Sequence, residues 1–222
     1  PHHVSMESPS AAPWHLPVRV LASAVLLGLC ARGGLGWVLV FVALVPWLLA
    51  LQDGRGLRHA LWAGWLMSVA FMAAVFHWFG AAIGAYTGIG GVVATAVLLV
   101  LAPLLQPQFI AYAVVRALAR RRHGPAAVAL TAASAWVACE SLLPRLLGDS
   151  LGHGLFPSML LRQAADLGGA AGLALLVLLA NEAVAQAWCR RRDGARRVLA
   201  ALAPALGIVL ALAGYGALRL AT

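Results

Sequence analysis

The sequence predicts an all-α membrane protein, a polytopic bundle of about seven transmembrane helices. Of the 222 residues, 63% are hydrophobic and only 10% are charged, whereas soluble domains are about half apolar and about a quarter charged. The apolar residues also gather in runs close to the roughly 20 residues that a helix needs to cross the hydrocarbon core of a bilayer. These runs leave no room for a sizeable soluble domain in the same 222 residues.

Residues 1–15 are polar and rich in proline, and we expect them to be a disordered segment before a transmembrane domain at 16–222. The predicted spans are 16–31, 35–51, 57–80, 90–118, 125–143, 168–188 and 198–220. The first span is the weakest, since it contains Arg19, and the second holds Pro46 near its end. The third ends in an aromatic group at 76–79.

The fourth predicted span is interrupted by Pro103 and Pro107 around Gln106, where freed backbone carbonyls need partners. A polar segment at 144–167 separates the fifth span from the sixth. Small residues recur at helical spacing in two places, which permits close helix approach in lipid; they are Gly80, Gly84 and Gly88, and then Gly168, Gly169 and Gly172. Close packing is the favoured interpretation of these glycines, and a backbone passage for a ligand is the alternative.

The basic residues predict the topology. All sixteen are arginine, and the chain contains no lysine. The breaks after the second, fourth and sixth spans contain eleven of them, namely Arg55, Arg58, Arg116, Arg120, Arg121, Arg122, Arg190, Arg191, Arg192, Arg196 and Arg197. The other breaks hold Arg32, Arg145 and Arg162. Because arginine is retained on the cytoplasmic side, the N-terminus is predicted to be cytoplasmic and the C-terminus to lie on the outer face. The net charge of +9 is thereby explained without a nucleic-acid partner.

Residues 148–152 match the G-x-S-x-G motif of serine hydrolases, and His153 follows. That motif has catalytic meaning on a strand-to-helix turn of a soluble sheet, which this sequence does not predict. An intramembrane protease would need a histidine base on another helix, and no histidine follows His153. We therefore interpret the segment as a polar loop. Cys30, Cys139 and Cys189 are far apart in the sequence, so neither a metal site nor a cofactor is predicted.

Three acidic residues lie at or near the depth of a predicted span, where an ionised carboxylate is costly and should face the bundle interior or an interface. Glu140 follows Trp136 by four residues and is expected to pair with Arg145 or Arg162. Asp166 is expected to cap the sixth helix. Glu182 lies deepest, and it is the residue to test for a buried polar contact.

His77 and Trp78 end the third predicted span. A tryptophan there is typical of the aromatic belt at a membrane interface. The alternative is that the aromatic group at 76–79 lines an entry for lipid from the outer leaflet.

The stretch 135–187 resembles the membrane domain of the apolipoprotein N-acyltransferases. The family pattern is W-V-x-x-E, a loop with Pro and Leu-Gly, then Q-x-A-D-L-G-G and a helix containing Asn. The matching residues are Trp136, Val137, Glu140, Pro144, Leu151, Gly152, Gln163, Ala165, Asp166, Leu167, Gly168, Gly169 and Asn181. Segment 41–51 and Trp78 are similar as well, whereas the family's aromatic-rich loop is thinned here to residues 155–158.

The resemblance implies an enzyme of the bacterial inner membrane that transfers an acyl group from a phospholipid to the N-terminal cysteine of a lipoprotein. It implies two partners, the phospholipid donor and the lipoprotein acceptor, and six candidates for contact with lipid or substrate: His77, Trp78, Trp136, Glu140, Gln163 and Asp166. In the family the chemistry belongs to an outer nitrilase-like domain with a Glu, Lys and Cys triad, which forms a thioester.

This chain departs from the family because it ends after the seventh predicted span and contains no lysine. No catalytic residue is therefore predicted within it. One expectation is a truncated or split family member whose nitrilase-like part is another chain. The alternative is a membrane-only relative that acts as a small transporter or scaffold; the absence of an evident internal repeat weakens the transporter alternative.

Overall fold

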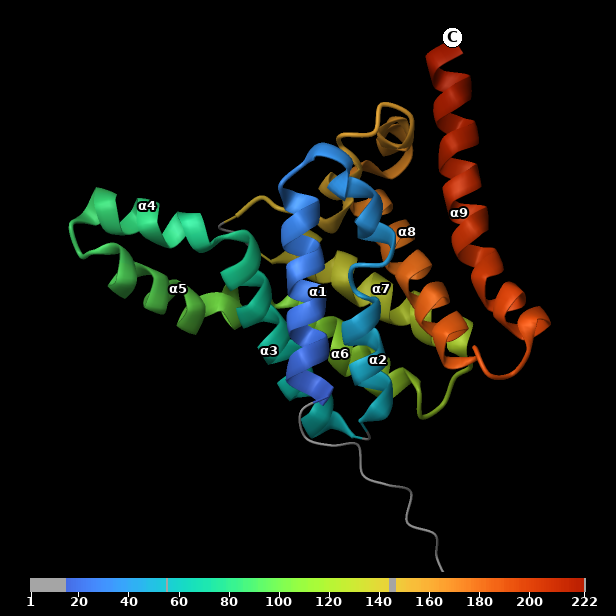
Figure 1. Cartoon of the computed structure of the whole chain (residues 1–222), viewed down its shortest axis with the longest axis horizontal. Coiled ribbons are helices and arrows are strands. Elements are labelled where there is room, and N and C mark those ends of the chain that lie inside the picture. The colour runs from blue at the N-terminus through green and yellow to red at the C-terminus, as the bar shows by residue number, and fades with distance from the viewer. Residues whose placement is uncertain (1–14, 55, 144–146, 222) are drawn as a thin grey trace, which may run out of the picture.

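A computed structural model describes residues 15–54, 56–143 and 147–221, and these residues form helices and connecting turns without a strand (Figure 1). The α-helices are α1 (His15–Ala31), α2 (Val45–Asp53), α3 (Leu57–Val75), α4 (His77–Thr87), α5 (Gly91–Leu105), α6 (Gln108–Ala119), α7 (Pro125–Leu142), α8 (Ala165–Cys189) and α9 (Ala195–Ala221). Three 3₁₀ helices complete the described elements: η1 (Gly34–Phe41), η2 (Leu151–Leu155) and η3 (Leu161–Ala164). The all-α prediction is confirmed. The predicted disordered segment falls almost entirely outside the described residues.

Five helical stretches in the described ranges are long and apolar enough to cross a membrane: Gly34–Asp53, Gly91–Ala119, Pro125–Leu142, Leu161–Cys189 and Ala195–Ala221. A sixth arises if α3 and α4, bent by 70° at their junction, are counted as one span. The first predicted span corresponds to α1, whose 17 residues give a length of about 26 Å at 1.5 Å per residue, somewhat less than a bilayer core of about 30 Å. The structure thus has five or six stretches of full spanning length, against about seven predicted.

Three predicted spans are broken. The second divides into η1 and α2, and the fourth divides into α5 and α6 at Gln106 and Pro107, where the sequence had predicted an interruption. The prediction of one helix over 57–80 is wrong, because α3 ends at Val75 and the chain turns into α4. In Figure 1, α4 and α5 form a hairpin that projects sideways from the other helices.

The glycines differ in their roles. A Cβ added to Gly84 would lie 2.5 Å from the Cα of Gly91, and one added to Gly80 would lie 2.3 Å from Thr95 Oγ1. These two glycines therefore let α4 and α5 approach closely, as predicted. The same interpretation is wrong for Gly88, Gly168, Gly169 and Gly172, since an added Cβ would meet nothing within 4 Å at any of them. Gly169 instead adopts φ 62° and kinks the start of α8.

The helices alternate between two ends of the molecule. At one end, which we call the basic end, the turns α2–α3, α6–α7 and α8–α9 lie together (Figure 1). Side-chain contacts join these elements there: Arg19 pairs with Asp53 at 2.5 Å, Arg120 Nη1 donates to Leu51 O at 3.0 Å, and Cys189 Sγ lies 2.8 Å from Gln52 Oε1. At the other end, called here the opposite end, the turn from α1 to η1 lies near η2 and η3 (Figure 1). The arginine-rich breaks thus gather at one end, as the alternation predicted.

Candidate lipid-binding cavity

A cavity of about 380 Å³ lies at the opposite end. Its apolar wall comes from α1, η1, α3, α6 and α7 and includes Leu27, Val40, Phe71, Val75, Phe109 and Trp136. Its polar wall comes mainly from α6, α7 and the segment before and within η2, and includes Gln108, Glu140, Asp149, Ser150 and His153. The cavity therefore combines a large hydrophobic surface with polar groups, which is typical of a small-molecule site.

Glu140 is the central acidic group of this polar wall. It is buried, with 5% of its surface exposed, and it accepts hydrogen bonds from Trp136 Nε1 at 2.9 Å and from Ser150 Oγ at 3.0 Å. Trp136 precedes it by one helical turn on α7, so the helix itself positions the indole donor. The loop residue Ser150 completes the arrangement from outside the helix.

A second set of hydrogen bonds stabilises the break between α5 and α6. Ser68 Oγ donates to the carbonyl of Gln106 at 2.9 Å, which supplies the partner that the sequence predicted for this break. The Gln106 amide donates to Asp149 at 3.2 and 3.3 Å, and Gln108 Nε2 donates to Gln106 Oε1. The helix break and the loop at 147–150 are therefore tied to each other beside the cavity.

The G-x-S-x-G segment forms no hydrolase elbow. Ser150 accepts from Gly152 N at 3.4 Å and caps η2, while its hydroxyl donates to Glu140. His153 Nδ1 accepts from the backbone N–H of Ser150 at 3.2 Å rather than from the hydroxyl. A histidine so engaged is not placed to take a proton from Oγ. The interpretation of this segment as a polar loop is confirmed by its geometry.

Of the six candidate contact residues, the structure brings only Trp136 and Glu140 together at this cavity. His77 and Trp78 lie at the start of α4, where Trp78 is 56% exposed. Gln163 Nε2 donates to the carbonyl of Met159 at 2.9 Å within its own loop. Asp166 pairs with Arg219 of α9 at 2.8 Å.

The predicted cap by Asp166 is wrong, since the N-cap of α8 is Ala164 and carries no side-chain hydrogen bond. Of the two partners expected for Glu140, Arg145 lies outside the described residues. Arg162 donates to the carbonyl of Phe156 and stacks over its ring. Sequence reasoning also missed Ser150 and His153 as cavity residues. The only signal was their place in the polar loop.

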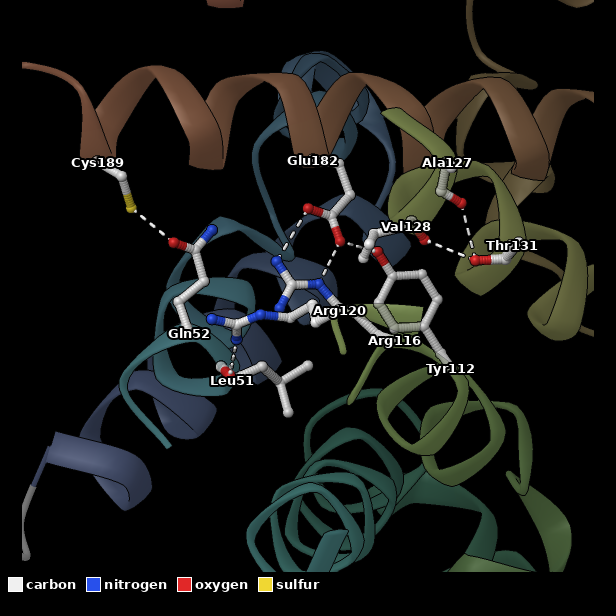
Figure 2. A network of polar contacts seen from close by, with 10 residues as sticks. All are labelled: Leu51, Gln52, Tyr112, Arg116, Arg120, Ala127, Val128, Thr131, Glu182 and Cys189. Atoms are coloured by element: carbon white, nitrogen blue, oxygen red, sulfur yellow. Dashed lines mark hydrogen bonds and ion pairs between the residues drawn. The ribbon is translucent and has the colours of Figure 1, made fainter. Parts of the chain in front are cut away.

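The basic end contains the buried polar contact expected of Glu182. Its carboxylate accepts from Arg116 Nε at 2.5 Å, from Arg116 Nη2 at 3.0 Å and from Tyr112 Oη at 2.6 Å (Figure 2). Arg116 was counted among the arginines of a connecting break, but it lies within α6 and is 4% exposed. The bidentate geometry is the one that most favours a guanidinium–carboxylate pair.

Asn181 joins α8 to the broken second span. Its Oδ1 accepts from Leu44 N at 2.9 Å, and its Nδ2 donates to Val40 O at 2.8 Å and to Val177 O at 2.9 Å. Ser23 of α1 accepts from Trp47 N at 2.9 Å. Backbone groups freed between η1 and α2 are thereby satisfied by side chains of other helices, which a break inside a bilayer requires.

Within the described ranges, no three His, Cys, Asp or Glu side chains come close enough together to hold a metal ion.

Comparison with known protein families matches residues 23–183, from within α1 to within α8, to the apolipoprotein N-acyltransferase N-terminal domain. This stretch contains every residue of the cavity named above. A comparison with individual curated proteins gives no match. Because the match covers more than half of the chain, the protein belongs to the family of the apolipoprotein N-acyltransferase N-terminal domain.

Proposed function

We propose that this chain is the membrane domain of an apolipoprotein N-acyltransferase and that the cavity at the opposite end holds an acyl chain of its lipid substrates. The observation that carries the proposal is the cavity itself, with its apolar wall of aromatic and branched side chains and its hydrogen-bonded polar wall around Glu140. A lipid has the same two-part character. Each methylene buried there contributes about 0.8 kcal/mol, and ester and amine groups suit the polar wall.

The proposal includes a membrane orientation. With the basic end in the cytoplasm of a bacterial inner membrane, the cavity faces the outer, periplasmic side, where the C-terminal end of α9 also lies. Acyl transfer to the N-terminal cysteine of a lipoprotein would then take place above the cavity. The nucleophile would come from a nitrilase-like domain, because the family's triad requires a lysine and these 222 residues contain none.

An aromatic layer argues against the alternative of a small transporter. Phe109 contacts Trp47 and Trp136 with ring centroids 5.7 and 4.7 Å apart, and Tyr112 contacts the same two tryptophans at 5.5 and 6.1 Å. Trp136 of this layer donates to Glu140, and Tyr112 donates to Glu182. Its four members, Trp47, Phe109, Tyr112 and Trp136, are each at most 2% exposed. Packed aromatic rings therefore occupy the interior between these two carboxylates.

Photo-crosslinking tests the proposal. The purified chain in lipid nanodiscs is exposed to a phospholipid that carries a diazirine near the end of one acyl chain, and labelled peptides are mapped by mass spectrometry. We expect labels on the cavity wall and a severalfold loss of these labels in Val75→Phe, which fills the cavity. Val100→Phe is the matched control, since Val100 is 77% exposed on α5.

Labels distributed over exposed helix faces, with no difference between the two variants, would overturn the acyl-chain assignment. A cellular test addresses the reaction. The chain is co-produced with a nitrilase-like acyltransferase domain in cells that lack N-acyltransferase, and N-acylation of a lipoprotein is measured. Absence of N-acylation with both polypeptides stably present would contradict the role in acyl transfer.

A further inference from the structure

A second cavity lies at the basic end, far along the bundle from the proposed acyl-chain site. It has a volume of about 280 Å³ and lies between α3 and α6, beside the turn from α2 to α3. Four basic side chains line it, namely His59, Arg116, Arg120 and Arg121, and its lining among the described residues includes no acidic side chain. We call this cavity the arginine pocket.

Arg116 is the buried member of the arginine pocket, with only 4% of its surface exposed. Two of its nitrogens bind the Glu182 carboxylate, and Figure 2 shows the third, Nη1, on the side of the guanidinium away from that carboxylate. Within the part of the chain that the structure describes, Nη1 is a buried donor without a hydrogen-bond partner. An unsatisfied buried donor costs about 1–3 kcal/mol, and more for a charged group. The orphaned nitrogen therefore indicates an acceptor that the described residues do not supply.

The chemistry of the pocket specifies that acceptor as an anion with several oxygens. Arg120 and Arg121 add two further guanidinium groups to the lining on the next turn of the chain. Guanidinium groups bind phosphate oxygens with directional, often bidentate, hydrogen bonds. A phosphate group therefore suits both the unpaired nitrogen of Arg116 and the other guanidinium groups of the lining.

Neighbouring residues on α3 indicate that the phosphate belongs to a lipid. Trp62 and Trp65 are 51% and 40% exposed and contact each other at 5.4 Å between ring centroids. Exposed tryptophans mark the depth of a membrane interface, and they lie within two turns of His59 on the same helix. A further apolar pocket of about 430 Å³ runs along α3 and α6 between these tryptophans and Ile110. Headgroup depth and an adjacent apolar surface are what a membrane lipid requires.

We propose that the arginine pocket binds the phosphate of an anionic phospholipid from the leaflet at the basic end, with an acyl chain along the apolar pocket beside Trp62 and Trp65. Basic pockets between transmembrane helices suit lipid headgroups in general. This site is separate from the acyl-chain cavity, so either assignment can fail without the other.

Native mass spectrometry of the detergent-purified chain tests the proposal with phosphatidylglycerol and, for comparison, phosphatidylcholine of the same chain length. We expect preferential binding of phosphatidylglycerol. Arg121→Gln should weaken that binding about three- to tenfold, as the loss of one charge-assisted hydrogen bond predicts. Arg196→Gln is the matched control, because it removes one exposed arginine from the same end but outside the pocket.

The double variant Arg116→Gln with Glu182→Gln removes the guanidinium without leaving its partner as an unpaired charge, and it should abolish the preference for phosphatidylglycerol. If this variant does not fold, as judged by thermal unfolding, the comparison of Arg121→Gln with Arg196→Gln decides whether the arginine pocket binds the lipid. Equal binding of both lipids, or equal losses in those two variants, would overturn the site. Binding of inorganic phosphate that Arg121→Gln weakens, with no binding of phosphatidylglycerol, would overturn the lipid assignment in favour of free phosphate.

Discussion

Glu182 at the basic end and Glu140 at the opposite end are both buried carboxylates, but their surroundings differ. Glu182 is 2% exposed, is held by a guanidinium and a phenol, and borders a pocket of about 300 Å³ at the basic end. Glu140 is held by an indole N–H and a serine hydroxyl beside a cavity. The contacts of Glu182 join α8 to α6, whereas the contact of Glu140 with Ser150 joins α7 to the loop before η2. The comparison contrasts a carboxylate that links two helices with one that fixes a loop beside the proposed acyl-chain cavity.

The largest effect is expected from breaking the ion pair at the basic end. Glu182→Ala leaves Arg116 as an uncompensated buried charge, which should lower the free energy of unfolding by about 3–5 kcal/mol. Thermal and denaturant unfolding in detergent, followed by tryptophan fluorescence, measure this. Arg116→Met combined with Glu182→Leu should recover most of the stability, since apolar residues of similar volume replace the pair. A loss below about 1 kcal/mol in the single variant would contradict a buried ion pair.

Asn181→Leu should have the next largest effect on the free energy of unfolding. It tests whether neutral hydrogen bonds stabilise the interior as ion pairs do. The change leaves Val40 O and Leu44 N without their side-chain partner. At about 1–3 kcal/mol for each unsatisfied group, we expect a loss of about 2–3 kcal/mol in the same unfolding measurement. Thr131→Val on α7 serves as the control, because that hydroxyl bonds only its own helix in the contacts identified. Equal losses in the two variants would show that the link from α8 to the second span contributes nothing specific.

Ser150→Ala sharpens the comparison at the cavity. It removes one hydrogen bond to Glu140 from a half-buried loop residue, so the free energy of unfolding should fall by only about 1 kcal/mol. Crosslinking of the acyl-chain probe should change more clearly than stability, because Glu140 then has one fewer donor beside the cavity. Ser141→Ala, an exposed position on α7, should change neither quantity. If both serine variants alter crosslinking alike, the Glu140–Ser150 contact has no role in ligand binding.

The smallest effect is expected at the exposed pair between Asp166 and Arg219, whose side chains are 44% and 53% exposed. Asp166→Asn should cost about 0.5 kcal/mol or less, because solvent screens the pair. Added salt should reduce even this difference, and unfolding at two ionic strengths measures it. A loss comparable to that of Glu182→Ala would mean that burial does not distinguish the two ion pairs.

Uninterrupted apolar runs predicted helices well. The starts and ends of α7 and α9 agree with the predicted spans to within a few residues, because lipid solvation and length suffice to define such helices. The break between η1 and α2 was not predicted, although Pro46 lies in the first turn of α2. The partner of its freed backbone groups, Asn181, lies far along the chain. The end of the third span was misplaced for a related reason. An apolar sequence does not show where a helix bends to form the hairpin of α4 and α5.

The candidate site was predictable where helical spacing alone places residues together. Trp136 and Glu140 lie four residues apart on α7 and meet as that spacing predicts. Ser150 reaches Glu140 through an irregular loop, so no periodicity indicated it. Arg116 was assigned to a connecting break because arginines usually lie there. Its burial follows from a partner on α8, which only the packing of the helices reveals.

The hydrogen bonds of Asn181 also have a consequence for how the protein is made. Leu44 and Asn181 are separated by 137 residues, a length that a ribosome adds in roughly ten seconds at about 5–20 residues per second. During that interval the interrupted second segment has been synthesised, but the Asn181 side chain that bonds its backbone has not. Until the sixth segment is made, Leu44 N and Val40 O need other hydrogen-bond partners, such as water or an insertion factor. Membrane insertion of this chain is therefore expected to be late and cooperative, and not helix by helix.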